Sequence, residues 1–339
     1  MAENVMDQIV SELKRDAPGF YPGLGELRNV RVVGHTPKAD HYIYDLALDF
    51  AGGSERVAAK VYRASKCGPQ GARSRAKTEA ANLQRVYEAF QKRRLAGVPR
   101  PIGDCTELGA VVAEKLPGLP LQSIIMKAAL LPGYAHNGTL GDAARDTGTW
   151  LHSFHKATAD MPNAFQPDSL LGDLEKLCLS CKGEGLDDAA VRTILDGSRS
   201  ILTRTRKNLP CSAVLNDFSP LNVIVGERGI CIADYAHMSP HGSSYHDVAH
   251  FLASVEALEK YPFCNRMITS EVQEQFLAAY GVNASEQAVI RVLKMKALLG
   301  MFAQGRGVKE TAVRKKVMWA TVMKRFIQQA AQRSLAPAA

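Results

Sequence analysis

Three short strand-like runs interrupt a long stretch of helical periodicity, and they limit the folds open to this chain more than any other feature. The runs cover residues 213–215, 223–225 and 230–233. Asp217 follows the first run, Asn222 lies five residues later, and Asp234 ends the third run. This is the polar set that phosphoryl transfer needs, because one carboxylate can accept a proton from an attacking hydroxyl while the amide and the second carboxylate offer hard oxygen ligands to magnesium.

The chain around this β island divides at residues 116–120, where two prolines and a glycine predict a connector. Before it, the pattern predicts helices over 3–15 and 74–94 and strands over 30–33, 42–50, 56–62 and 110–115, with a hairpin turn at Gly52-Gly53. After it, we expect helices over 121–131, 140–157, 168–181, 187–207, 244–259, 270–280, 285–303 and 308–333. These patterns predict an α+β chain with two domains. The first, 1–117, holds an antiparallel sheet and one long helix, and the second, 118–339, is mainly helical and contains the polar loop 213–235.

A lysine and a glutamate upstream form a second candidate set. Lys60 lies in the run 57–62, and Glu79 follows 19 residues later on the long helix. A strand lysine fixed by a helix glutamate supplies a positioned positive charge to nucleotide phosphates. Lys60 also alternates with apolar neighbours, as any outward-facing strand residue would, so the pair is weak evidence by itself.

The ordered set resembles the aminoglycoside phosphotransferase family, the small-molecule branch of the protein-kinase-like fold. That family carries His-Gly-Asp-x-x-x-x-Asn, then a strand ending in Ile-Asp, then Asp-Leu-Ala. The similar segments here are Leu215-Asn216-Asp217 with Asn222, Ala233-Asp234-Tyr235, Asp247-Val248-Ala249, and a Leu-His pair at Leu151-His152. The resemblance spans about residues 30–255 in the same order.

The resemblance implies a bilobal kinase-like fold that uses ATP and magnesium to phosphorylate a hydroxyl group. The implied roles are a catalytic base at Asp217, magnesium ligands at Asn222 and Asp234, a phosphate grip by Lys60 and Glu79, and a hinge at Glu114-Lys115-Leu116 whose backbone meets adenine. Asp247 is implied to support the catalytic loop rather than to take part in the chemistry.

Two departures from the family pattern leave an alternative open. Leu215-Asn216 stands in place of His-Gly, and Gly34-His35-Thr36-Pro37-Lys38 occupies the turn where a Gly-rich phosphate loop would lie. The alternative is a catalytically silent pseudokinase, a binding module that keeps the fold and presents a basic C-terminal surface.

Charge is concentrated at the C-terminal end. The chain carries a net +8, yet residues 291–339 alone carry +10, with Glu310 as their one acid. Two helices with core-facing apolar sides and solvated basic sides explain this pattern most simply. An anionic partner or an anionic membrane surface is the functional alternative, whereas nucleic acid is not expected because few aromatic residues interleave the charges. From Gly118 onward basic residues exceed acidic ones by four, which favours a sugar or glycan intermediate over a polycationic acceptor.

Composition excludes several other classes. The chain has 339 residues, 46% of them hydrophobic, and no apolar run of the ~18–20 residues that cross a bilayer. Seven scattered cysteines and a first segment without a signal-peptide pattern predict reduced thiols and a cytoplasmic protein, with a peripheral position at the inner membrane face as the alternative. His246 and His250 have zinc-ligand spacing, but no third ligand stands at a familiar distance.

Overall fold

The computed structural model describes residues 2–131, 139–182, 186–205, 208–227, 229–261, 263–307, 322 and 324–335. The chain forms two compact units. The first contains residues up to Gly118 together with Ile224–Met238, and the second contains Leu119–Val223 and the chain from Ser239 onward. The first unit therefore takes in a segment that lies far beyond the connector in sequence.

A four-stranded antiparallel sheet organises the first unit, in the order β1-β2-β3-β4. Its strands are β1 (Leu27–Pro37), β2 (His41–Phe50), β3 (Gly53–Tyr62) and β4 (Ala110–Glu114). Phe50 pairs with Gly53, so the predicted hairpin is present, and its turn is made by Ala51 and Gly52. Short turns join β1 to β2 and β2 to β3, whereas the connection from β3 to β4 is long and contains a helix.

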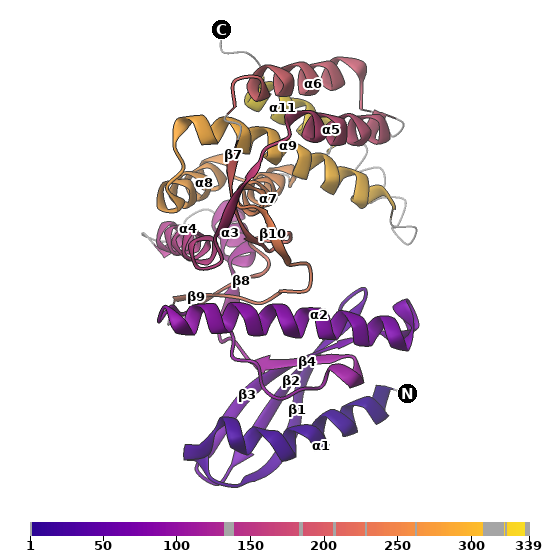
Figure 1. Cartoon of the computed structure of the whole chain (residues 1–339), viewed down its shortest axis with the longest axis vertical. Coiled ribbons are helices and arrows are strands. Elements are labelled where there is room, and N and C mark those ends of the chain that lie inside the picture. Colours follow the sequence, from indigo (N-terminus) through magenta and orange to yellow (C-terminus); the bar gives the residue numbers. More distant parts are fainter. Residues whose placement is uncertain are drawn as a thin grey trace. The chain divides into compact units, whose positions relative to one another are not determined.

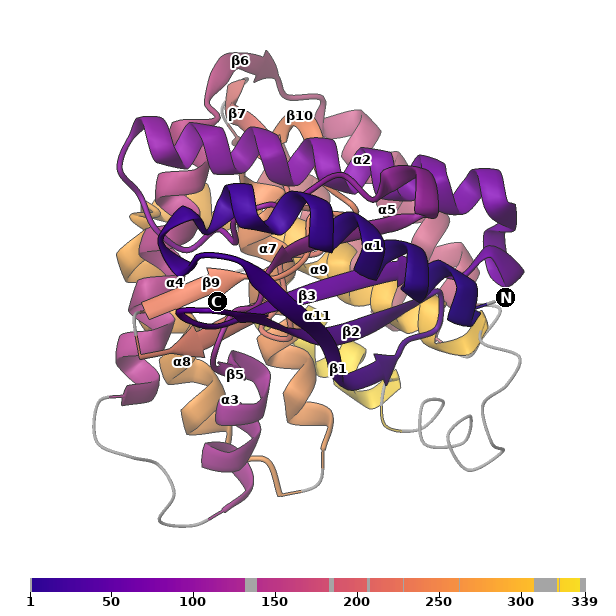
Figure 2. The ribbon, with the colours of Figure 1, turned by 90° about the horizontal axis from the view of Figure 1, so that it is seen from below.

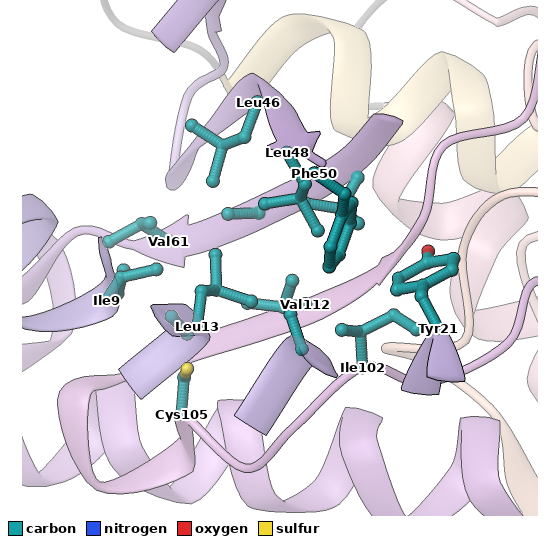
Figure 3. Packing of buried hydrophobic residues seen from close by; sticks show 14 residues of the cluster. Ile9, Leu13, Tyr21, Leu46, Leu48, Phe50, Val61, Ile102, Cys105 and Val112 are labelled. Carbon is teal, nitrogen blue, oxygen red and sulfur yellow. The ribbon is translucent and has the colours of Figure 1, made fainter. Parts of the chain in front are cut away.

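One face of this sheet carries the core of the first unit. Helix α1 (Ala2–Phe20) crosses this face (Figure 2) and buries one side of its helical surface against the strands. Figure 3 shows the packed side chains, which include Ile9, Leu13, Tyr21, Leu46, Leu48, Phe50, Val61 and Val112. In β2 and β3 the core residues alternate along the strand, as the two-residue period of a strand requires. The other side chains of β3, including Lys60 and Tyr62, therefore project from the opposite face.

Helix α2 (Ala64–Lys92) packs against β3 and β4. Sequence periodicity predicts this helix only from residue 74, because Pro69 and Gly68 precede that point. In the structure Gly68 has non-helical dihedral angles, so α2 is kinked at this residue. A further helical segment, which begins at Ala64, lies on the N-terminal side of the kink. Helix α1 is also longer than predicted and contains Pro18 near its end.

The second unit is mainly helical (Figure 1). Its helices are α3 (Leu121–Leu130), α4 (Thr139–Ala157), α5 (Pro167–Lys182), α6 (Asp188–Leu202), α7 (Tyr245–Glu256), α8 (Arg266–Tyr280), α9 (Ala284–Gly307) and α11 (Lys324–Leu335). Helix α4 packs against α8, α7 against α9, and α11 against α6. The helix predicted over 308–333 is present as α11 from residue 324, and residues 308–321 and 323 lie outside the described part of the chain.

A small sheet in the second unit leads into the polar loop. Strand β7 (Asn208–Val214) pairs with β6 (Asp160–Ala164) on one side and with β10 (Ser239–Ser243) on the other. Neither β6 nor β10 is predicted from the sequence, since both are short and contain proline. The other two strands of the β island are present as β8 (Val223–Gly226) and β9 (Gly229–Ile232), which are neighbours in a separate sheet.

No helix within the described ranges is both long enough and apolar enough to pass through a bilayer. All seven cysteines are described, and each is a free thiol.

The connector makes a close backbone contact that only glycine permits. Gly118 has φ +141°, and a Cβ built on it would lie 2.3 Å from the carbonyl oxygen of Val225. We expect Gly118→Ala to lower the free energy of unfolding by about 2–3 kcal/mol, because both the dihedral angle and the space exclude a side chain. Gly172→Ala is the matched control, since nothing lies within 4 Å of its added Cβ on α5. Equal melting temperatures for the two variants would contradict this account.

Candidate active site

Lys60 joins two carboxylates within the first unit. Its ammonium nitrogen Nζ lies 3.0 Å from Oε1 of Glu79 on α2 and 3.0 Å from Oδ1 of Asp234, which follows β9. The strand period places Lys60 on the face of β3 away from the α1 core, and α2 supplies Glu79 there. Glu79 and Asp234 lie 19 and 174 positions after Lys60 in the sequence, and the structure brings all three residues together.

Burial and charge set the protonation of this group. The side chain of Lys60 is 14% exposed, that of Glu79 4% and that of Asp234 23%. Burial opposes the charged form of Lys60, yet Glu79 and Asp234 outweigh it and raise the lysine pKa. Burial likewise tends to raise the pKa of Asp234, but the Lys60 charge and a bond from the Ala236 N–H hold it below the usual value. Lys60 and Asp234 are therefore an ion pair at neutral pH.

Further hydrogen bonds hold Glu79 and the segment after Asp234 in place. The Tyr62 hydroxyl donates to Oε2 of Glu79 at 2.6 Å, so both carboxylate oxygens of Glu79 are held. Burial raises the pKa of Glu79 more than Lys60 lowers it. One helical turn later, the buried amide of Asn82 donates to the carbonyls of Tyr235 and Met238 at 3.0 and 3.2 Å. Helix α2 thereby anchors both Lys60 and the segment after Asp234.

In the second unit, a tight turn joins Asp217 and Asn222. The Asn222 amide nitrogen Nδ2 donates to the Asp217 carbonyl at 3.0 Å and to Oδ2 of its carboxylate at 3.2 Å, and its backbone N–H bonds Ser219. The buried ring of Phe218 stacks on Trp150 and packs near Phe251, and these contacts hold the loop in place. Among the described residues, Oδ1 of Asn222 and Oδ2 of Asp234 accept no hydrogen bond, so each leaves one oxygen able to bind a hard cation.

Asp247 holds the start of this loop. Its fully buried carboxylate accepts backbone N–H bonds from Leu215 at 2.8 Å and from Asn216 at 2.9 Å. Asn216 has φ +63°, a left-handed conformation in which glycine is at ease and asparagine is among the best tolerated residues. Asn216, where the aminoglycoside phosphotransferase pattern has glycine, is therefore compatible with the backbone of the loop.

Sequence reasoning missed one residue of this network. His155 is buried, with Nε2 3.1 Å from Oδ2 of Asp247 and Nδ1 2.9 Å from the Tyr280 hydroxyl. His152, the histidine of the Leu-His pair identified by resemblance, instead contacts the Tyr280 carbonyl. No local signal distinguishes His155 from the other polar residues of α4, because its partner Asp247 lies 92 residues later in the sequence.

We expect His155→Leu to lower kcat while leaving the KM for nucleotide unchanged, because Asp247 loses a bond on the oxygen that also holds Leu215. Unfolding should become easier by about 1–3 kcal/mol, since the Tyr280 hydroxyl also loses its partner. His155→Asn, which keeps a donor, should recover part of kcat, and His152→Leu should behave as the unmodified protein. Steady-state kinetics measure kcat and KM, and thermal melts measure stability. A His155→Leu variant with a lower melting temperature but full kcat would show that His155 contributes only to packing.

The hinge predicted at 114–116 continues β4. The Glu114 N–H bonds the Arg100 carbonyl and the Lys115 N–H bonds the Arg56 carbonyl, whereas the N–H of Leu116 has no partner among the described residues. Glu114 and Leu116 also line a cavity of about 440 Å³ inside the first unit, with the end of α2 and parts of β8 and β9. The backbone at Leu116 is thus available to a ligand.

Two sequence predictions change in detail. Gly34 to Pro37 lie within β1, and the turn to β2 is made by residues 38–40, so it contains no glycine. Of the other histidines, His241 bonds Asp160 at 3.0 Å, and Nδ1 of His250 lies 3.2 Å from the Phe218 carbonyl. Within the described ranges, no three His, Cys, Asp or Glu side chains are grouped as metal ligands.

No protein-family model and no curated protein matches the sequence. Solved structures match almost the whole chain. A glucosamine kinase in complex with glucosamine, ADP and inorganic phosphate aligns with a TM-score of 0.54 at 12% identity, over 97% of this chain and 99% of that one. An amicoumacin kinase in complex with AMP-PNP and Ca²⁺ gives 0.54 at 14% identity over 92% of each chain. An aminoglycoside phosphotransferase from Alicyclobacillus acidocaldarius gives 0.51 at 15% identity, over 90% and 91%.

The chain has the fold of these small-molecule kinases. The α+β class with an antiparallel N-terminal sheet and a mainly helical remainder is confirmed. At these identities the comparison establishes the fold, and the roles of individual residues rest on the geometry described above.

Proposed function

We propose that the protein is a phosphotransferase that moves the γ-phosphoryl group of ATP to a hydroxyl of a small molecule. The observation that carries this proposal is the position of Lys60, 3.0 Å from both Glu79 and Asp234. A lysine held between two carboxylates keeps its charge in a partly buried place, where it can bind phosphate oxygens.

Each residue then has one task. Lys60 binds the phosphates, and Glu79 orients Lys60. Asp217 accepts the proton of the acceptor hydroxyl and aligns its oxygen for attack. Asn222 and Asp234 would hold magnesium through the two oxygens that accept no hydrogen bond, and the bound ion neutralises charge on the phosphates. Most of the rate acceleration comes from positioning and charge neutralisation, because phosphoryl transfer needs little covalent chemistry from the protein.

We further propose an amino sugar, a neutral sugar or a glycan intermediate as the acceptor. The glucosamine kinase structure contains glucosamine as its small-molecule ligand, and the basic excess from Gly118 onward disfavours polycations such as aminoglycosides. Free thiols throughout are compatible with a reducing compartment, which fits the predicted cytoplasmic location.

A screen for nucleotide turnover tests the proposal. ADP release should be measured with ATP or GTP and magnesium, in the presence of glucosamine, other hexoses, glycan precursors and an aminoglycoside. We expect acceptor-dependent ADP release that EDTA abolishes and that an Asp217→Asn sample lacks. Magnesium-dependent ATP binding without turnover for any acceptor would favour the pseudokinase alternative, and absence of nucleotide binding would remove the kinase proposal altogether.

A further inference from the structure

Three basic residues of the C-terminal end, Lys294, Lys296 and Arg333, are paired inside the second unit. Lys294 and Arg333 both form ion pairs with Glu256, Arg333 also bonds Glu259 at 3.3 Å, and Lys296 bonds Asp173 at 2.7 Å. The side chains of Glu256 and Glu259 are almost fully buried. These basic residues therefore stabilise the helical core and are not an open basic surface.

Two arginines nearby have no such partner. Arg204 lies in the turn after α6 and Arg291 lies on α9, and neither has an acidic partner among the described residues. Both are exposed, and both line one cavity of about 920 Å³ between α6, α9 and α11. Arg333 on α11 lines it as well (Figure 1 shows the three helices). Arg204 and Arg291, which lack an acidic partner, thus line the same space as Arg333, whose guanidinium group is paired with Glu256 and Glu259.

The rest of the lining is rich in hydrogen-bond donors. Ser200 and Ser334 line the cavity, and their hydroxyls have no partner among the described residues. Ser285, in the first turn of α9, lines the cavity as well, and its hydroxyl donates to Oδ1 of Asn283 at 2.7 Å. Asp196, the one acid among the described lining residues, is already bonded to Arg199 at 3.3 Å. A dianion with several acceptor oxygens complements this set, because guanidinium groups bind phosphate through paired N–H donors.

The size of the cavity adds a constraint on the ligand. A volume of about 920 Å³ is far larger than one phosphate and lies within the range of small-molecule sites. Ile201, Ala288 and Leu335 give it an apolar part. We propose that this cavity binds a phosphorylated small molecule, with the phosphate on Arg204 and Arg291 and the organic part against the apolar side chains. The site lies wholly in the second unit and is independent of Lys60 and Asp234.

Titration calorimetry on the full chain in EDTA tests this site with glucose 6-phosphate and inorganic pyrophosphate as probes, and with glucose as the unphosphorylated control. Arg204→Gln and Arg291→Gln should each weaken binding about tenfold or more, and the double variant should weaken it further. Arg192→Gln is the matched control, because Arg192 is an exposed arginine of α6 that does not line the cavity. Since the replaced side chains are exposed, the melting temperature and ATP turnover should stay unchanged.

Three outcomes would overturn the proposal. One is that neither phosphorylated probe binds the unmodified protein, and another is that the double variant binds them as the unmodified protein does. The third is loss of binding in Lys60→Met, which would place the probe at the proposed nucleotide site. Binding of phosphatidylserine vesicles that depends on Arg204 and Arg291, without any response to the soluble phosphates, would likewise replace this proposal with a membrane surface.

Discussion

Asp217→Asn should reduce kcat for phosphoryl transfer by about 10²- to 10⁴-fold while nucleotide affinity stays within about twofold. The amide is nearly isosteric with the carboxylate, so it can keep the bond from Asn222, but it cannot accept the proton of an acceptor hydroxyl. Because magnesium-nucleotide binding is assigned to other residues, the loss should appear in kcat alone. Single-turnover kinetics and titration with a non-hydrolysable ATP analogue separate the two quantities.

Asn216→Gly is the matched control for this prediction. It changes the adjacent residue of the same loop, and the positive φ at that position suits glycine. We expect activity close to that of the unmodified protein and a melting temperature within a few degrees of it. If Asp217→Asn keeps full activity, Asp217 is not the base; if Asn216→Gly loses activity equally, the loss reports a disturbed loop rather than a missing proton acceptor.

The sequence predicted the parts of this molecule whose signals are local. Strand alternation and the Gly52-Gly53 pair placed the hairpin, and the order of Asp217, Asn222 and Asp234 identified the polar loop. The pair Lys60 and Glu79 was weak evidence in the sequence, and their 3.0 Å contact in the structure is what brings them into one group with Asp234. A motif therefore names candidate residues, while the contact depends on how β3 and α2 pack.

The features that sequence reasoning missed depend on tertiary packing. Pro18 is a local signal against a helix, yet α1 extends past it to Phe20, whereas Gly68 does interrupt α2 and makes a kink with a further helical segment before it. Strand β10 contains Pro240 and Gly242, and it is held by β7 rather than by its own strand propensity. His155 resembles any polar residue of an amphipathic helix until Asp247, 92 residues later, is seen beside it.

The charge of the C-terminal end illustrates the same limit. Net charge over residues 291–339 suggested an external anionic partner, but charge counts contain no information on pairing. In the structure Lys294 and Arg333 pair with Glu256, which lies outside that segment. Among the described residues, Arg204 and Arg291 line one cavity without an acidic partner, and Arg204 is not part of the segment that the count singled out.

Lys60→Met should lower both magnesium-ATP affinity and stability. Without the ammonium group, Glu79 and Asp234 keep carboxylates in a poorly hydrated place with no cation between them. Removal of one partner from a buried ion pair typically costs about 3–5 kcal/mol of unfolding free energy. Lys77→Met is the matched control, because Lys77 is an exposed lysine of α2, the helix that carries Glu79, and among the described residues its ion pair is with exposed Glu107.

The loss of stability caused by Lys60→Met should depend on pH in one direction only. Lys60 holds the pKa of Asp234 below its usual value, so the stability that this pair adds is present at neutral pH and is lost as pH falls through the lowered pKa. The melting-temperature difference between the unmodified protein and Lys60→Met should therefore be largest near neutral pH and shrink as the pH falls below about 4. A difference that grows on acidification would contradict the ion pair.

The double variant Lys60→Met/Glu79→Gln separates structure from function. Glu79→Gln removes one of the two unbalanced carboxylates and keeps an acceptor for the Tyr62 hydroxyl, so it should restore part of the lost stability. It supplies no positive charge, so magnesium-ATP affinity and kcat should stay as low as in Lys60→Met. Recovery of both quantities together would show that Lys60 acts only by holding the first unit folded. Recovery of stability alone would assign the loss of turnover to the missing charge on the phosphates.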